Sequence, residues 1–179
     1  MKGLRVANRY ASSLLDLALE QKKEDAVASD MEMLLKTIDE SHDFEVFLSS
    51  PVIDASKKVD VITSIFKGKV DELSLNFLTL IAKKRREGVI AMIAQEYINQ
   101  FKAHKNILVA DVISAAKIDA KIESSLKEKI KVIHNGEIEM RNQVDPELIG
   151  GFILRIGDQQ VDASIARKLN DLKKVFNAN

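Results

Sequence analysis

The chain has 179 residues, 46% of them hydrophobic and 30% charged, a balance typical of a globular protein with a hydrophobic core. The 27 basic residues cancel the 27 acidic residues, so no net positive field favours nucleic acid as a partner. The absence of cysteine excludes disulfides, zinc–thiolate sites and thiol nucleophiles.

Residues 1–105 are expected to form six helices, because apolar residues recur at three- and four-residue spacing along this half of the chain. Pro51 stops the third helix, and Gly88 is expected to end the fifth. The short connections indicate an antiparallel bundle. The helices are predicted at about residues 4–19, 25–39, 44–48, 54–68, 71–86 and 89–104.

The pattern changes after Lys105, and residues 106–179 are expected to form a small α+β domain. Strands are predicted at 107–113, 138–144 and 152–156, because these segments are rich in β-branched residues or alternate apolar and polar positions. A helix follows Asp119, and a last helix follows Asp162 with Ile165, Leu169, Leu172 and Phe176 turned inward. The fold class is therefore predicted as α+β, with a domain boundary inside the polar stretch 102–106.

The first and fifth helices carry more apolar surface than one packed face needs, which is an arc of roughly 100°. On the first helix the apolar arc spans roughly 180°, and it includes Val6, Tyr10 and Leu17. On the fifth, Leu73, Phe77 and Leu80 form an apolar side beyond the one that would suffice for packing. Either the fifth helix is covered on all sides within the bundle, or these stripes line a groove for a partner helix.

Residues that could carry catalysis or bind a metal are not grouped in this sequence. The histidines His42, His104 and His134 do not share the spacing of metal ligands on a helix. Gly150-Gly151 precedes a strand, whereas a phosphate-binding loop follows a strand and opens a helix. Lys83 to Arg86 is a basic run that could contact phosphate, but the last turn of a helix also favours cations. We expect no enzyme activity, no metal and no cofactor.

Two segments resemble the family of the F-type ATP synthase delta subunit, which includes the mitochondrial oligomycin-sensitivity-conferring protein. The sequence GGFILRIGD at 150–158, followed by DAS at 162–164 and LNDL at 169–172, is similar to the carboxyl-terminal signature of the family. The sequence VANRYA at 6–11 is similar to its opening helix, although Asn8-Arg9 stands where many members have Arg-Pro. The motif residues are Gly150, Gly151, Arg155, Gly157, Asp158, Asp162 and Ser164.

These motif residues are expected to be structural. The glycines permit backbone conformations that other residues resist, and Gly157-Asp158 can turn the chain between strands. Asp162 or Ser164 can cap the last helix, and Arg155 can pair with Asp158 across the hairpin.

The resemblance implies a non-catalytic stator subunit of a rotary ATP synthase, which ties the alpha/beta catalytic head to the b subunits of the peripheral stalk so that the head resists rotation during proton-driven ATP synthesis. Residues 1–105 would bind the head by holding the amino-terminal helix of an alpha subunit, and residues 106–179 would bind the stalk. Carried onto this sequence, the helix-binding residues are Val6, Tyr10, Ser13, Leu17, Phe77, Leu80 and Arg86.

The expected location follows from this implied role. The segment 1–9 lacks the apolar core of a secretory signal, and no stretch reaches the roughly 18 apolar residues that span a bilayer. We expect a peripheral protein on the cytoplasmic face of a bacterial inner membrane, or an organelle-encoded equivalent, that meets the membrane only through its complex. The isolated chain is expected to be monomeric. The rival hypothesis is a helical RNA-binding protein that uses Lys83 to Arg86, which leaves residues 106–179 unexplained.

Overall fold

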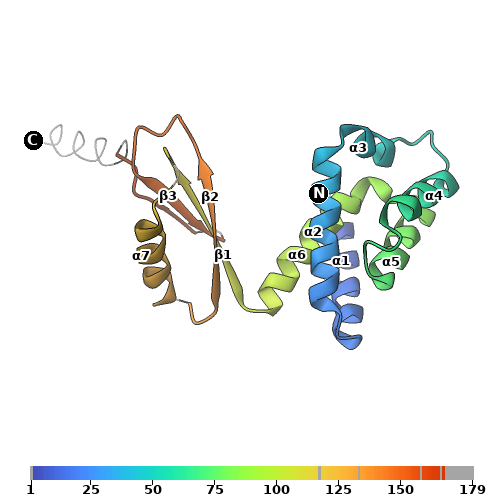
Figure 1. Cartoon of the computed structure of the whole chain (residues 1–179), viewed down its shortest axis with the longest axis horizontal. Coiled ribbons are helices and arrows are strands. Elements are labelled where there is room, and N and C mark those ends of the chain that lie inside the picture. The colour runs from blue at the N-terminus through green and yellow to red at the C-terminus, as the bar shows by residue number, and fades with distance from the viewer. Residues whose placement is uncertain (1, 117, 133, 158, 166, 168–179) are drawn as a thin grey trace, which may run out of the picture. The chain divides into compact units, whose positions relative to one another are not determined.

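The computed structural model describes residues 2–116, 118–132, 134–157, 159–165 and 167. The chain divides into two compact units, Met1–His104 and Lys105–Asn179, which are described separately (Figure 1). Helices make up the first unit, and a four-stranded sheet with a helix makes up the second. The α+β class predicted from the sequence is confirmed.

The first unit packs α1 and α2 against α6, and α4 against α5. Small side chains on α1, among them Ala7, Ala11 and Ala18, are fully buried and allow a close approach of the neighbouring helix. Tyr97 of α6 is also fully buried, and its hydroxyl donates to the Glu24 carbonyl at 3.2 Å. The helices are α1 Lys2–Glu20, α2 Glu24–Glu40, α3 His42–Ser49, α4 Ala55–Phe66, α5 Glu72–Lys83 and α6 Ile90–His104, with a 3₁₀ turn η1 at Glu87–Val89.

The fifth helix ends earlier than the sequence predicts, at Lys83 rather than Arg86. Arg85 adopts a left-handed conformation with φ 55°, and its N–H donates to the Ala82 carbonyl at 2.9 Å. The Arg86 N–H donates to the Ile81 carbonyl at 3.1 Å, which completes a Schellman motif. Gly88, expected to end the helix, lies instead inside η1. The basic run therefore leaves the helix after Lys83, so the predicted placement of all four residues in its last turn is wrong.

The second unit is a sheet with strand order β2-β1-β3-β4. A crossover through α7 makes β2 parallel to β1, whereas β3 is antiparallel to β1 and forms a hairpin with β4. Ala110, Val112 and Leu154 of the sheet share a hydrophobic core with Leu126 and Ile130 of α7. The elements are β1 Ile107–Ser114, α7 Ala120–Lys131, β2 Glu137–Val144, β3 Phe152–Ile156 and β4 Gln159–Asp162.

The glycines of the carboxyl-terminal motif occupy conformations that suit glycine. Gly151 has φ 82°, and a Cβ atom there would lie 2.4 Å from the Ala163 carbonyl oxygen. Gly157 has φ 55° in the turn between β3 and β4, with open space around it. Gly150 lies before β3, where its carbonyl accepts from the Ile165 N–H at 3.0 Å. These contacts tie the segment after β4 to the start of β3.

The polar residues of the motif bond within the unit. Arg155 Nε donates to Gln160 Oε1 at 2.9 Å across the hairpin. Ser164 Oγ accepts from the Arg167 N–H at 3.2 Å, the geometry of a helix cap. Asp162 Oδ1 accepts from the Ser164 N–H at 2.9 Å, and hydrogen bonds from Ser164 lower the pKa of Asp162. The predicted pairing of Arg155 with Asp158 lies outside the described residues, as does the last predicted helix beyond Arg167.

Candidate functional site

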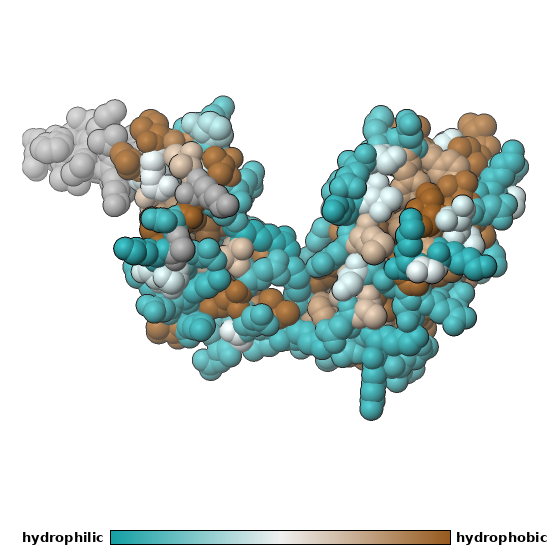
Figure 2. Space-filling view, viewed as in Figure 1, coloured by the Kyte–Doolittle hydropathy of each residue, from teal (hydrophilic) through white to brown (hydrophobic). Residues whose placement is uncertain are grey.

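A groove of about 320 Å³ opens between α1 and α5. Most of its walls are leucine and aromatic side chains, which gives it the apolar character of a site for another helix. Figure 2 shows that hydrophobic side chains reach the surface of the helical unit on the face drawn there. The groove is lined by Tyr10, Ser13, Leu14, Leu17, Leu73, Asn76, Phe77 and Leu80.

The groove is open because α1 and α5 turn other faces into the core. On α5, Leu78 and Ile81 are buried, whereas Leu80 remains 46% exposed. On α1, Leu17 is 41% exposed. Tyr10 and Phe77 are half-buried and pack against the core from its edge. The fifth helix is therefore not covered on all sides by its own unit, and apolar area on both walls stays in contact with water.

An aromatic contact joins the two walls. The rings of Tyr10 and Phe77 lie edge to face, with centroids 6.3 Å apart and planes at 71°. This is a favourable geometry for two aromatic rings, because the edge of one meets the electron-rich face of the other. Tyr10 and Phe77 thereby bring α1 and α5 into contact across the groove, while both residues stay partly exposed.

Arg86 lies at one end of the groove. Its Nη1 donates to the Tyr10 hydroxyl oxygen at 3.0 Å, and its guanidinium carbon is 5.5 Å from the centroid of the Tyr10 ring. Arg86 and Val6 line a neighbouring hollow rather than the groove itself. Among the residues predicted from the sequence, Tyr10, Ser13, Leu17, Phe77 and Leu80 line the groove together.

Three lining residues were not among the predicted site residues: Leu14, Leu73 and Asn76. Leu14 is 1% exposed and forms part of the floor. Leu73 precedes Phe77 by four positions, so one helical turn brings it to the same side. The apolar side of the fifth helix already included Leu73, and this spacing is the signal that would have identified it as a lining residue.

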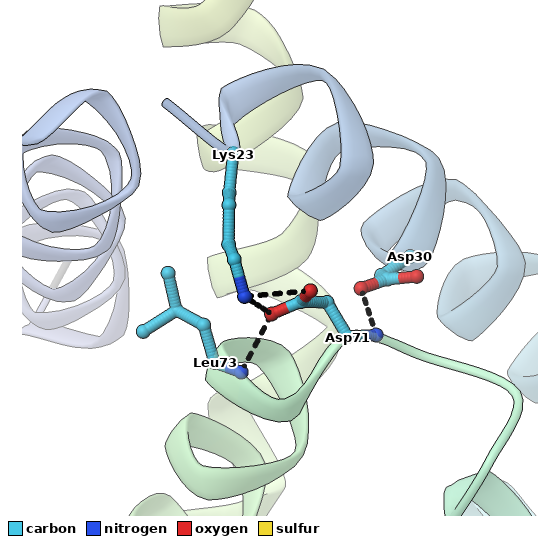
Figure 3. Close-up of polar contacts among 4 residues, drawn as sticks. All are labelled: Lys23, Asp30, Asp71 and Leu73. Carbon is cyan, nitrogen blue, oxygen red and sulfur yellow. Dashed lines mark hydrogen bonds and ion pairs between the residues drawn. The ribbon is translucent and has the colours of Figure 1, made fainter. Parts of the chain in front are cut away.

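The other end of the groove is held by a polar cluster that joins three helices (Figure 3). Lys23, which follows α1, places its Nζ 2.9 Å and 3.0 Å from the two carboxylate oxygens of Asp71. Asp71 caps α5, because its Oδ1 accepts from the Leu73 N–H at 2.9 Å. The Asp71 N–H donates to Oδ2 of the buried Asp30 of α2 at 2.9 Å. The bond from Leu73, followed by the bond from Lys23, lowers the pKa of Asp71.

A buried lysine supports the turn that follows Arg86. Lys58 of α4 is 1% exposed, and its ammonium group contacts the carboxylate of Glu87. It also donates to the carbonyls of Leu48 at 2.8 Å and Ser50 at 2.7 Å. The charge is thus satisfied by an ion pair and two carbonyls, as a buried ammonium group requires. The residue that follows Arg86 is therefore joined to α4 by a buried ion pair.

The groove offers binding surface rather than reactive groups. In the part of the chain that the structure describes, no group of three or more His, Asp or Glu side chains could hold a metal ion. Within the same residues, no helix is both long enough and apolar enough to cross a membrane. Lys23 and Arg86 lie just beyond the two ends of the groove, and from Tyr10 to the end of α1 at Glu20 the helix rises by about 15 Å. A helix of about three turns would fit that length.

Comparisons with known proteins agree with this architecture. A family model described as "ATP synthase delta (OSCP) subunit" matches residues 6–176. A relative from Christiangramia forsetii, "ATP synthase subunit delta", is 34% identical over 179 residues, which are 100% of this chain and 97% of the relative. A relative of the same name from Syntrophomonas wolfei is 35% identical over 94% of this chain and 93% of its own length. A chain in the Toxoplasma gondii mitochondrial ATP synthase hexamer has the same fold, with a TM-score of 0.77 at 22% identity over 97% of this chain and 98% of that one.

Proposed function

The chain belongs to the ATP synthase delta (OSCP) subunit family, and from this premise we propose that it is a stator subunit that links the catalytic head of a rotary F-type ATP synthase to the peripheral stalk. The central shaft of such a machine pushes on the head as it turns. Unless the head is tied to the stator, it rotates with the shaft and no ATP forms. The chain connects the head to the stator, catalyses no reaction and needs no cofactor.

The helical unit is the head-binding part of this proposal. Its six α-helices, joined by short connections, form an antiparallel bundle within residues 1–105. The groove between α1 and α5 holds the amino-terminal helix of an alpha subunit, with Tyr10, Phe77 and Leu80 as the apolar contacts and Arg86 at one end. The observation that carries this proposal is that Tyr10 and Phe77 touch each other across an open apolar groove instead of being sealed in the core.

The second unit, within residues 106–179, binds the b subunits of the peripheral stalk. We place the complex at the cytoplasmic face of a bacterial inner membrane, or at an organelle-encoded equivalent, with this chain attached to the membrane only through its partners. The chain alone is monomeric. RNA binding by Lys83 to Arg86 is disfavoured, because Arg86 contacts Tyr10 and the family match covers residues 6–176.

Calorimetric titration with a peptide of the alpha-subunit amino terminus tests the groove. Replacing Tyr10 or Phe77 with alanine removes a half-buried aromatic contact and should weaken binding by about 2 kcal/mol or more. Val52→Ala is the matched control, since Val52 is apolar and 90% exposed but lies outside the groove. Unchanged affinity in both aromatic variants would refute the placement of the partner helix.

A pull-down from native membranes after a gentle salt wash tests the wider role. ATP synthase subunits should be recovered with the tagged chain. Recovery of the chain without them would contradict the stator proposal independently of where the groove lies.

A further inference from the structure

The sequence contains a single Asn-Gly pair, Asn135-Gly136, between α7 and β2. An asparagine side chain can cyclise onto the backbone nitrogen of the next residue, and glycine obstructs that approach least because it has no Cβ. Helices and strands oppose the reaction, since ring closure turns the backbone out of its regular hydrogen bonds. The helix α7 ends at Lys131 and β2 begins at Glu137, so regular structure does not restrain the pair.

Both reacting groups of the pair are available. The Asn135 side chain is exposed, so its amide is in contact with water and can leave as ammonia. Among the residues that the structure describes, no backbone carbonyl accepts a hydrogen bond from the Gly136 N–H. Removing the proton from this nitrogen, which makes it a nucleophile, therefore breaks no backbone hydrogen bond.

The packing of the second unit requires the glycine that makes the pair reactive. A Cβ atom at position 136 would collide with the carbonyl oxygen of Asn106 and with Nε2 of His134. The same Nε2 lies 3.1 Å from that carbonyl oxygen, and Asn106 directly precedes β1 with a φ of 56°. Gly136 thus occupies a corner between the start of β1 and the start of β2, where only a hydrogen atom fits in place of a side chain.

We propose that Asn135-Gly136 is a site of spontaneous deamidation, which converts position 135 to aspartate and isoaspartate. The Gly136 nitrogen forms a bond to Cγ of Asn135, and the bond from Cγ to the side-chain nitrogen breaks. That nitrogen leaves as ammonia with the proton that Gly136 loses. Water then opens the cyclic imide: attack at Cγ gives aspartate, and attack at the main-chain carbonyl carbon gives isoaspartate. The reaction needs water alone as co-reactant and is independent of the proposed function.

Isoaspartate lengthens the main chain at a place with little free space. The backbone then runs through the former side chain of Asn135, so an extra carbon atom precedes Gly136. The first pair of the parallel ladder, Ile107 with Glu137, follows immediately. The added length pushes Gly136 against the Asn106 carbonyl or shifts Glu137 along β1. Either movement loosens the start of β2, so the modification changes the second unit.

Ageing of the full chain in warm, mildly alkaline buffer tests the proposal. Trypsin cuts after Lys131 and Arg141, so the peptide 132–141 carries Asn135 and the next peptide carries Asn142. Asn142 is the internal control, since it is also exposed but lies within β2. Its side-chain oxygen accepts from Ser114 Oγ at 3.1 Å, and a glutamine follows it in the sequence.

Mass spectrometry should show position 135 deamidating about tenfold or more faster than Asn142, which corresponds to a barrier lower by about 1.4 kcal/mol. An isoaspartyl methyltransferase should transfer methyl groups from S-adenosylmethionine to the aged chain. The Asn135→Gln variant, which would have to close a larger ring, should accept far fewer. Equal rates at Asn135 and Asn142, or equal methylation of the aged wild type and the aged variant, would overturn the proposal.

Freshly prepared Asn135→Asp separates the effect of the new charge from that of the longer main chain. The isoaspartate form is isolated from the aged protein by chromatography, and amide hydrogen exchange is compared between the two. Amides at the start of β2 should exchange about tenfold or more faster in the isoaspartate form, because the ladder opens locally there. Amides of the helical unit should exchange equally in both. Equal exchange at the start of β2 would overturn the effect assigned to the corner at Gly136.

Discussion

Lys58 and Glu87, 29 residues apart in the chain, form an ion pair with side-chain exposures of only 1% and 10%. The ammonium group also holds the carbonyls of Leu48 and Ser50, so one side chain joins the end of α3, the body of α4 and the turn after α5. Glu87 directly follows Arg86, which contacts Tyr10 at the end of the groove. Part of the groove geometry therefore depends on a buried charge that lies outside it.

Removing one partner of this pair should destabilise the protein strongly. Lys58→Met leaves the Glu87 carboxylate buried without its counter-charge, which costs about 3–5 kcal/mol in comparable sites. Urea unfolding followed by circular dichroism measures the change. Lys57→Met is the matched control, since Lys57 is the exposed neighbour and should alter stability by less than about 0.5 kcal/mol.

The double variant Lys58→Met/Glu87→Leu separates the loss of charge balance from the loss of contacts. If the single variant is unstable because of an unpaired buried charge, the double variant should recover much of the lost stability. A double variant as unstable as Lys58→Met would show that the bonds to the Leu48 and Ser50 carbonyls are the important part.

Asp71 should contribute stability that depends on pH. Its pKa is lowered in the folded protein, so the folded state favours the carboxylate more than the unfolded chain does. The contribution is complete above the unfolded pKa, near 4, and is lost as the pH falls through the lower folded pKa. The urea midpoints of the wild type and Asp71→Asn should differ most above about pH 5 and should approach each other as the pH falls below about 4. A difference independent of pH would contradict an ionised Asp71 in its contact with Lys23.

The excess apolar arcs on two helices could be counted from the sequence, but they left open whether the fifth helix is covered on all sides. The resemblance to the family supplied the prediction that the first and fifth helices share one groove. Tyr10, Leu17, Phe77 and Leu80 share such arcs, and the structure brings them to one groove. What could not be predicted depends on contacts between distant residues or on unusual backbone conformations. The end of α5 is such a case, since Arg85 adopts the left-handed conformation that sequence rules assign to glycine.

The residues that hold the ends of the groove in place could not be predicted from the sequence either. Lysine is rarely buried, so sequence reasoning places Lys58 on the surface until the carbonyls of Leu48 and Ser50 are seen to enclose it. The bond between Lys23 and Asp71 joins residues 48 positions apart, and no local pattern indicates that pairing.

Leu78 and Leu80 should separate stability from binding on the same helix. Leu78 is 2% exposed, so Leu78→Ala creates a core cavity and should cost about 2–5 kcal/mol of folding stability. Leu80 is 46% exposed, so Leu80→Ala should cost less than about 1 kcal/mol but should weaken binding of the alpha-subunit peptide. Thermal unfolding and calorimetric titration of both variants provide the comparison. Unchanged affinity of the Leu80→Ala variant for the peptide would show that this side of α5 does not belong to the interface.

Gly151 and Gly157 should respond differently to the same substitution. Both have positive φ, so alanine is strained at either position, by about 1 kcal/mol. At Gly151 the new Cβ would also lie 2.4 Å from the Ala163 carbonyl oxygen, whereas at Gly157 it meets nothing within 4 Å. Gly151→Ala should therefore destabilise the second unit by clearly more than Gly157→Ala.

The unfolding of the second unit can be followed against the first within one molecule. Both tyrosines, Tyr10 and Tyr97, belong to the helical unit, and the chain has no tryptophan. Tyrosine fluorescence therefore reports the helical unit, while circular dichroism reports both. Gly151→Ala should separate the two unfolding curves, with an earlier transition seen only by circular dichroism. If the fluorescence and circular dichroism curves of the variant coincide and both shift equally, the two units unfold together. If neither curve shifts from that of the wild type, the segment after β4 accommodates the new side chain without loss of stability.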